Sequence, residues 1–219
     1  MIERLIVLDT ETTGLDAENG HKIIEIGCVE IINRNITSNI FHEYINPMRK
    51  IDERAIEVHG ITNDKLKDKP IFADISMKFI KYLSNSPLVI HNAVFDLGFL
   101  KLEFEASNNN PSILEQDRII LDTLKIARAK FPSKRNSLDA LCSRYEVDNT
   151  DRSYHGALLD AKLLANVYLK MTRGQTKIEG LSERSVETNN ENIVNIEKRK
   201  KIVIHANKEE TELHDNYFK

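Results

Sequence analysis

The 219-residue chain contains no tryptophan, only two cysteines and no long hydrophobic run. Cys28 and Cys142 each lie in an apolar stretch and are too few for a disulfide framework, which favours reduced core thiols. The apolar run at residues 5–8 is far shorter than a signal sequence or a membrane span. The sequence therefore predicts a cytoplasmic protein that neither spans nor binds a membrane.

The chain also lacks an excess of positive charge and has few aromatic residues. It has 31 Lys and Arg against 34 Asp and Glu, a formal net charge of −3, and aromatic residues make up 6%. A strongly basic nucleic-acid-binding protein, or one that stacks many bases on aromatic rings, has a different composition. If this chain handles nucleic acid, metal ions or a partner subunit must therefore attract the phosphates. The hydrophobic fraction of 41% is sufficient for a folded core.

The composition changes near residue 174 and suggests three regions. Residues 1–173 are expected to form a globular domain, 174–192 a flexible linker and 193–219 a tail that binds a partner. A simple disordered terminus is the alternative interpretation. Short apolar clusters at 193–196 and 202–204 favour a segment that is buried on a partner.

The first 173 residues predict an α/β fold. Hydrophobic runs rich in β-branched residues predict strands over 4–8, 23–32, 36–44, 88–90 and 119–121. Helical periodicity and capping residues predict helices over 75–83, 92–104, from 122, from 137, and over 156–170. Because a hairpin opens the chain and strands alternate with helices afterwards, we expect a mixed sheet with helices packed on it.

Two acids, Asp9 and Glu11, follow the first predicted strand at positions i and i+2. Side chains alternate along a strand, so both carboxylates would point to the same side. Such a pair resists ionisation unless a cation lies between its members, and hard divalent metals bind through oxygen. The alternative is a pair of solvent-exposed acids. A phosphatase-type loop is not favoured, because the second acid is a glutamate.

Three further residues complete a candidate metal site. Asp96 is expected on the first turn of a helix, where the helix dipole alone would favour an acid. His155 and Asp160 are expected at the start of the last helix, separated along its axis by roughly 7.5 Å. Each motif alone is weak evidence. Four carboxylates at one sheet edge, however, would repel without metal, and two divalent ions would make them a phosphoryl-transfer site.

This order of motifs resembles the DEDDh family of 3′→5′ exonucleases, most closely the epsilon (proofreading) subunits of bacterial DNA polymerase III. The motifs are VLDTETTGL, HKIIEIG, VHGI, VIHNAVFD, FPSKRNSLDALCSRY and HGALLDA, at residues 7–15, 21–27, 58–61, 89–96, 131–145 and 155–161. The resemblance implies an RNase H-like fold and two bound Mg²⁺ or Mn²⁺ ions. It also implies hydrolysis of the 3′ end of DNA, single-stranded or frayed, with release of 5′-mononucleotides.

The resemblance assigns roles to individual residues. Asp9, Glu11 and Asp160 match direct metal ligands, which also contact the substrate, and Asp96 matches the fourth acid. His155 matches the general base, and histidine is the side chain that exchanges protons near neutral pH. The remaining substrate-binding candidates are His59 and Asn92 beside the terminal nucleotide, and Thr12, Leu15 and Phe95 around its base and sugar. Arg54 in the loop before VHGI is a further candidate, although the family more often has an acid at this position. The charges of Lys134 and Arg135 suit phosphate contacts, with a solvated loop as the alternative. Core packing is the alternative role for Thr12, Leu15 and Phe95.

The resemblance also implies partners. Residues 198–214 keep the basic, apolar and acidic blocks of family tails, which bind the alpha subunit of DNA polymerase III, and a theta-like subunit is a further partner of the family. Residues 174–180 lack the aromatic residue of a sliding-clamp peptide, so direct clamp contact is not expected. Two alternatives stay open: an RNA-trimming exonuclease of the same superfamily, and a mainly structural polymerase subunit.

Overall fold

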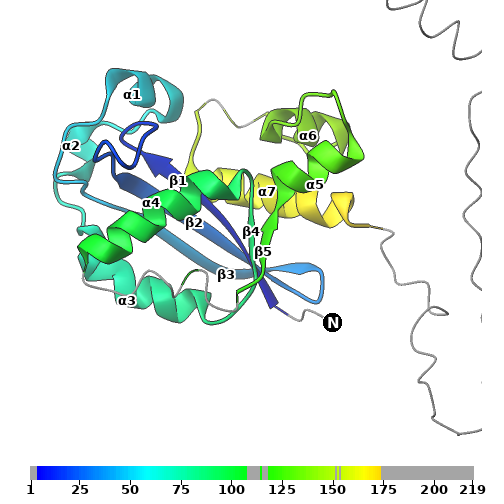
Figure 1. Ribbon diagram of the computed structural model, residues 1–219, viewed down its shortest axis with the longest axis horizontal. Coiled ribbons are helices and arrows are strands. Elements are labelled where there is room, and N and C mark those ends of the chain that lie inside the picture. Colours follow the sequence, from blue (N-terminus) through cyan, green and yellow to red (C-terminus); the bar gives the residue numbers. More distant parts are fainter. Residues whose placement is uncertain (1–3, 108–113, 115–117, 151, 153, 174–219) are drawn as a thin grey trace, which may run out of the picture. The chain divides into compact units, whose positions relative to one another are not determined.

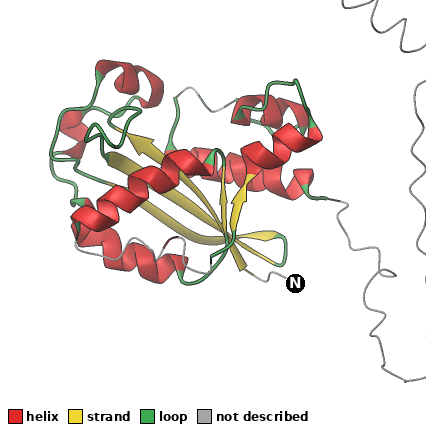
Figure 2. Ribbon diagram, in the orientation of Figure 1, coloured by secondary structure: helices red, strands yellow, loops and turns green. Residues whose placement is uncertain are grey.

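Strand β1 (Arg4–Thr12) lies at the centre of a five-stranded sheet of order β3-β2-β1-β4-β5. The computed structural model describes residues 4–107, 114, 118–150, 152 and 154–173 (Figure 1). The predicted tail and linker lie outside these residues. Helices cover both faces of the sheet (Figure 2). The mixed α/β architecture expected from the sequence is confirmed.

The strands on the two sides of β1 run in different directions. β2 (Ile23–Ile32) pairs with β1 antiparallel and continues into β3 (Asn35–Tyr44) through a tight hairpin. Asn33 and Arg34 form its turn with positive φ angles of 48° and 66°, as a type I′ turn requires. On the other side, β4 (Leu88–Ile90) pairs parallel with β1, and β5 (Ile120–Asp122) pairs parallel with β4.

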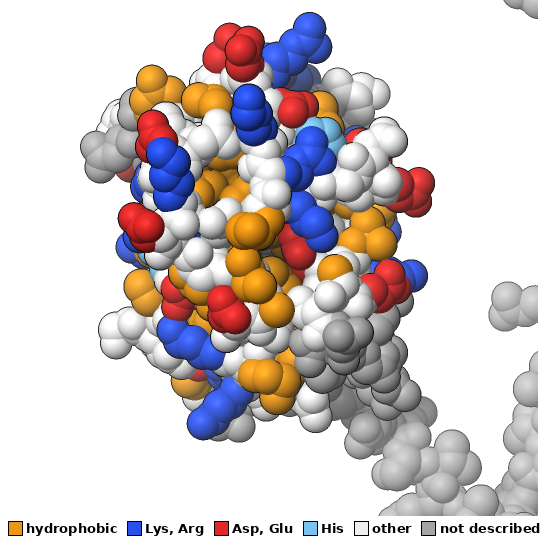
Figure 3. Space-filling view, turned by 90° about the vertical axis from the view of Figure 1, so that its left-hand side faces the viewer, with side chains coloured by type: hydrophobic (Ala, Val, Ile, Leu, Met, Phe, Trp, Pro, Cys, Tyr) orange, Lys and Arg blue, Asp and Glu red, His pale blue; other side chains and the backbone are white. Residues whose placement is uncertain are grey.

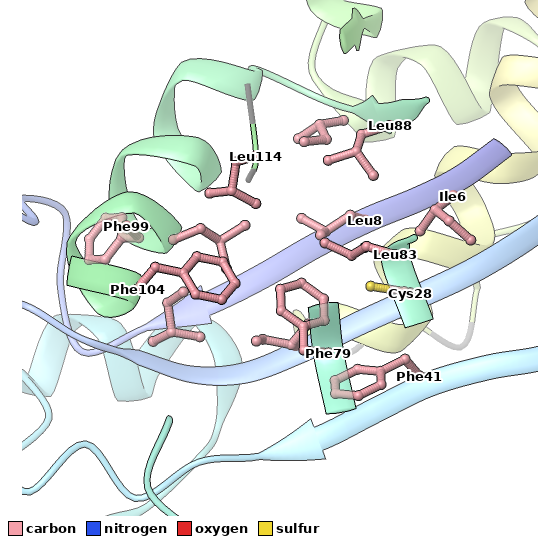
Figure 4. Packing of buried hydrophobic residues seen from close by; sticks show 14 of the residues in the cluster. Ile6, Leu8, Cys28, Phe41, Phe79, Leu83, Leu88, Phe99, Phe104 and Leu114 are labelled. Carbon is pink, nitrogen blue, oxygen red and sulfur yellow. The ribbon is translucent and has the colours of Figure 1, made fainter. Parts of the chain in front are cut away.

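Alternation along β1 separates two cores. Ile6 and Leu8 pack with α3 (Phe72–Leu83) and α4 (Ala93–Ala106) (Figure 4). Leu5 and Val7 point to the opposite face. There they join the helices α5 (Thr123–Lys130), α6 (Leu138–Arg144) and α7 (Ala157–Met171). The odd-numbered positions of β1, which include Asp9 and Glu11, therefore face the α7 side of the sheet.

Strand β1 is longer than the sequence predicted. The expected strand ended at residue 8, but antiparallel pairing with β2 continues through Glu11 opposite Glu25, with an irregularity before Thr12. Backbone pairing with a neighbour therefore overrides the polar character of the DTET segment. Asp9 and Glu11 consequently lie within a rigid strand and not beyond its end.

Two short helices were not predicted, α1 (Glu53–His59) and α2 (Asn63–Leu66). Arg54, expected in a loop, lies in α1. Helices of this length contain too few turns to give a clear hydrophobic period. The signal that was available is Gly60, which ends α1 in the left-handed conformation with φ 67°.

Charged side chains of both signs are interspersed with hydrophobic ones on the face that lies at the left of Figure 1, as Figure 3 shows. This mixture agrees with the small net charge of the chain. Within the part of the chain that the structure describes, every helix is too short or too polar to cross a membrane.

Candidate active site

A cleft of about 760 Å³ lies where β1, α4 and α7 meet. It brings together all five residues that the sequence predicted for the catalytic centre. These are Asp9, Glu11, Asp96, His155 and Asp160. Asp96 and Asp160 are each only 3% exposed, so the carboxylates are largely withdrawn from solvent.

Helix α4 delivers Asp96 from the face opposite α7. The Thr10 hydroxyl on β1 donates a hydrogen bond of 2.7 Å to Asp96 Oδ1, which fixes this carboxylate against the strand. The residue before the helix, Asn92, adopts a left-handed conformation with φ 68° and makes no side-chain capping bond. Asn92 thus occupies the N-cap position of α4, as expected for a helix starting at 92, but its side chain makes no capping hydrogen bond, and the residue lines the cleft.

Two residues of β2 set the position of α7 and thus of Asp160. Gly27 lies opposite Asp9, and a Cβ at this position would lie 2.2 Å from the Ala157 carbonyl carbon. Only a glycine allows this close approach of helix and strand. Beside it, buried Glu25 accepts a hydrogen bond of 3.2 Å from the Ala157 amide. This amide lies in the first turn of α7 and so has no acceptor within the helix. His42 Nε2 lies 2.7 Å from the other Glu25 carboxylate oxygen.

The carboxylates strongly oppose one another's ionisation. Burial, followed by the charges of Asp96, Asp160 and Glu11, raises the pKa of Asp9 well above its usual value. Burial and the charges of Asp160 and Glu25 raise the pKa of Glu11 to about 8. Burial also raises the pKa of Asp96 to about 7, although the Thr10 hydrogen bond opposes this shift. At neutral pH the cluster therefore needs additional positive charge.

Arg152, which the sequence analysis did not identify, supplies one such charge. Its side chain is 6% exposed, and two of its N–H groups donate to the two Asp160 oxygens at 2.6 Å each. It also lies within hydrogen-bonding distance of Asp139 and His155. Burial alone would lower the pKa of Arg152, but the hydrogen bonds and charges of Asp160 and Asp139 raise it. The sequence around Arg152 is polar, and a single arginine in such a segment does not indicate that it pairs with a buried carboxylate.

His155 lies at the entrance of α7, as expected, because Gly156 is the N-cap of this helix. Its Nδ1 lies 3.5 Å from Asp160 Oδ2, so the two side chains meet even though the residues were expected to be offset by roughly 7.5 Å along the axis. Ligand atoms of Glu11, His155 and Asp160 lie within 4.8 Å of one another. This oxygen-rich donor set fits a hard divalent cation.

The predicted substrate-binding residues fall into two groups. Asn92, Phe95 and Lys134 line the cleft. Among the described residues, the cleft lining does not include His59, Thr12, Leu15, Arg54 or Arg135. His59 is buried and its Nδ1 accepts from the Ile61 amide, and the Thr12 hydroxyl donates to the Gly14 carbonyl. The substrate roles of both groups stay predictions.

The cleft is also lined by residues that the sequence analysis did not name as site residues. Arg128 on α5 and Phe131 after it line the cleft, as does His91, whose Nδ1 lies 3.0 Å from the Thr123 hydroxyl. Burial lowers the pKa of His91. Two basic residues, Arg128 and Lys134, line the same cleft as the acids and are suited to phosphate contacts.

The chain is similar to several known proteins. A family model described as exonuclease, of the RNase T type, matches residues 6–168. DNA polymerase III subunit epsilon of Salmonella typhimurium is 49% identical over 224 residues, covering 98% of this chain and 92% of the relative. The subunit of the same name from Escherichia coli is 52% identical over 181 residues, covering 81% and 74%. A solved structure of exonuclease X with 5′-overhanging duplex DNA is 28% identical with a TM-score of 0.60, covering 77% and 90%.

Proposed function

Because the chain belongs to the RNase T-type exonuclease family, and within it to the epsilon subunits of DNA polymerase III, we propose that it removes mispaired nucleotides from DNA 3′ ends by metal-assisted hydrolysis. It is a 3′→5′ exonuclease of the replicative polymerase, as the sequence predicted. The carboxylate cluster in the cleft carries the mechanistic part of the proposal. The solved exonuclease X complex supports the RNase H-like fold and a DNA substrate.

Four acids would hold two divalent ions, Mg²⁺ or Mn²⁺. Asp9, Glu11 and Asp160 are the proposed direct ligands, and Asp96 is the fourth acid. The raised pKa values of Asp9, Glu11 and Asp96 support this role, since a cluster that disfavours its own ionisation is stabilised by cations. Ions bound there would stabilise charge on the transferred phosphate and lower the pKa of a bound water.

His155 is the proposed general base. Its side chain is 45% exposed at the edge of the cleft, whereas Asp160 behind it is almost completely buried. It can therefore take the proton of the attacking water and pass that proton to solvent. Water then bonds to phosphorus, the ester bond to the 3′ oxygen breaks, and a 5′-mononucleotide leaves.

The proposal predicts that the purified protein, given Mg²⁺ or Mn²⁺, removes a mismatched 3′ nucleotide from DNA faster than a matched one. Replacing His155 by alanine should lower the rate at least about a hundredfold, the usual contribution of a positioned general base. A gel assay with mismatched DNA, matched duplex and short RNA measures both effects. Tyr154→Ala is the control, because Tyr154 is the exposed neighbour and does not line the cleft.

The outcomes separate the alternatives. Faster trimming of RNA than of DNA would contradict the proofreading proposal and favour an RNA-processing enzyme. Full activity of the His155→Ala protein would remove this residue from the mechanism. Absence of nuclease activity in the wild-type protein would favour a structural subunit.

We propose that residues 193–219 bind the alpha subunit of the polymerase, that 174–192 link them to the exonuclease domain, and that 1–173 suffice for hydrolysis. The apolar clusters in the tail and the 98% coverage of this chain by the Salmonella typhimurium relative support this division. A theta-like subunit is a further proposed partner, whereas clamp contact through 174–180 is not proposed.

Deleting residues 174–219 should abolish co-purification with the alpha subunit and leave the trimming rate of free DNA within about twofold. The reason is that both hydrophobic cores and the whole cleft belong to the described residues before 174. A pull-down and the gel assay on the same preparation measure the two quantities. Undiminished binding of the alpha subunit would show that the tail is not the anchor.

A further inference from the structure

Arg152 uses the same oxygen atoms that the proposed mechanism needs for metal. Its Nε and Nη2 groups donate to Asp160 Oδ1 and Oδ2 at 2.6 Å each, a two-pronged contact. Its Nη1 group bonds to Asp139, an exposed acid of α6 that offers an anchor outside the cluster. A guanidinium paired with two carboxylates in this way acts as their internal counter-charge.

The same guanidinium also engages the proposed base. Arg152 Nη2 lies 2.9 Å from His155 Nδ1. A guanidinium can only donate hydrogen bonds, so Nδ1 must accept this one, and in a neutral imidazole the proton is then on Nε2. In this arrangement neither ring nitrogen has a lone pair free to accept a proton from water. His155 can act as a base only after Arg152 has released it.

We propose that Arg152 is a displaceable internal cation: it neutralises Asp160 and immobilises His155 in the metal-free protein, and it releases both residues when a divalent ion binds. The proposal rests on the proposed function, because it takes the four acids as a metal site. Metal binding and the activation of the base would then be one event. The Asp139 carboxylate gives the released guanidinium a partner it already contacts.

An orienting role for Arg152 predicts the opposite result. If the guanidinium stayed on Asp160 and held it in place for the metal, its removal would weaken metal binding. If Arg152 competes for Asp160, its removal eliminates the competing interaction and metal binding becomes tighter. The direction of the change in affinity therefore decides between the two roles.

The decisive experiment is isothermal titration of the metal-free full-length protein with Mn²⁺. Arg152→Gln should bind Mn²⁺ about tenfold more tightly than the wild type, since removing one unit charge in contact with a ligand is worth at least this much. Arg152→Lys keeps the charge and should fall between the two. Arg144→Gln is the matched control. Arg144 lies in the same region, but its side chain donates hydrogen bonds to the Asn136 side-chain oxygen and to the Arg135 carbonyl, and neither of these two acceptors is a carboxylate. Its affinity should equal that of the wild type.

The second readout is the ¹⁵N spectrum of the His155 ring, assigned with the His155→Ala protein. Metal-free wild type should show the proton on Nε2, and both Mg²⁺ and Arg152→Gln should change this signal. Unchanged or weaker Mn²⁺ binding by Arg152→Gln, or an unchanged His155 signal with Mg²⁺, would overturn the inference and leave the nuclease proposal intact. If the wild type does not bind Mn²⁺, the metal site itself is refuted, and the inference with it.

Discussion

Asp9→Asn should lower the rate of 3′-end hydrolysis at least about a thousandfold and, at pH 8 without metal, raise the melting temperature. The loss of activity follows because Asp9 is a proposed direct metal ligand, and the metal charge would contribute several kcal/mol to stabilisation of the transition state. The gain in stability follows because a neutral asparagine side chain at this position would no longer repel Glu11, Asp96 and Asp160. Removal of one charge from such a cluster is worth a few kcal/mol.

The gain in stability should depend on pH. The pKa of Asp9 and that of Glu11 are raised in the folded protein, so between about pH 4.5 and 8 the folded state binds more protons than the unfolded chain. The metal-free wild type should therefore lose stability as the pH rises through this range. Glu11, with its pKa raised to about 8, ionises as the pH rises from 5 to 8. The repulsion that Asp9→Asn removes therefore grows over this range, and the difference between the two proteins should grow with it.

Thermal denaturation in EDTA between pH 5 and 8, together with the gel assay in Mg²⁺, measures both parts of this prediction. Asp68→Asn is the control, because Asp68 is an exposed acid that does not line the cleft. A metal-free Asp9→Asn protein that is less stable than the wild type at pH 8 would contradict the electrostatic account. Full activity of Asp9→Asn would refute the metal assignment.

Gly27→Ala should destabilise the protein by roughly 3 kcal/mol and lower activity about a hundredfold. The new Cβ would lie 2.2 Å from Ala157 and Leu158 backbone atoms, which cannot yield without moving the start of α7. Because α7 carries Asp160, a shift of about 1 Å would misplace this carboxylate, and such errors cost about two orders of magnitude in rate.

Gly98→Ala is the matched control for this substitution. Gly98 is exposed within α4, and a Cβ there would have no heavy atom within 4 Å apart from its chain neighbours and the backbone of its own helix. Alanine should therefore stabilise the protein by up to about 1 kcal/mol, through helix propensity alone. Denaturant titration of both variants, with the gel assay, tests the comparison. A Gly27→Ala protein as stable and active as Gly98→Ala would show that contact with β2 does not position α7.

The fold could be predicted from the sequence wherever the local pattern and the tertiary pairing agree. The β2–β3 hairpin and the helices α3 and α7 meet this condition, because their apolar spacing matches the faces they bury. The continuation of β1 through Thr12 could not be predicted, because it depends on a partner strand and not on its own polar residues. Helix α1, with 7 residues, is too short to show a recognisable hydrophobic period.

The acids of the site were predictable because each lies in a motif with a recognisable neighbour. Asp9 and Glu11 follow a hydrophobic run, and Asp160 follows His155 at a fixed spacing. The role of Arg152 was not predictable, because it depends on contacts with Asp160 and His155 that form only in the folded chain. Gly27 and Glu25 were missed for the same reason, since their partner is the backbone of α7.

The position of β1 between an antiparallel and a parallel neighbour has a consequence for the order of folding. Its pairing with β2 closes a short loop, whereas β4 and α7 join it only after long intervening segments. Contacts between distant segments form late, because closing a long loop costs more entropy. We therefore expect the proposed catalytic cluster to be completed last. A chain still emerging from the ribosome, with Asp160 not yet docked, would not have the complete set of acids that the proposed hydrolysis needs.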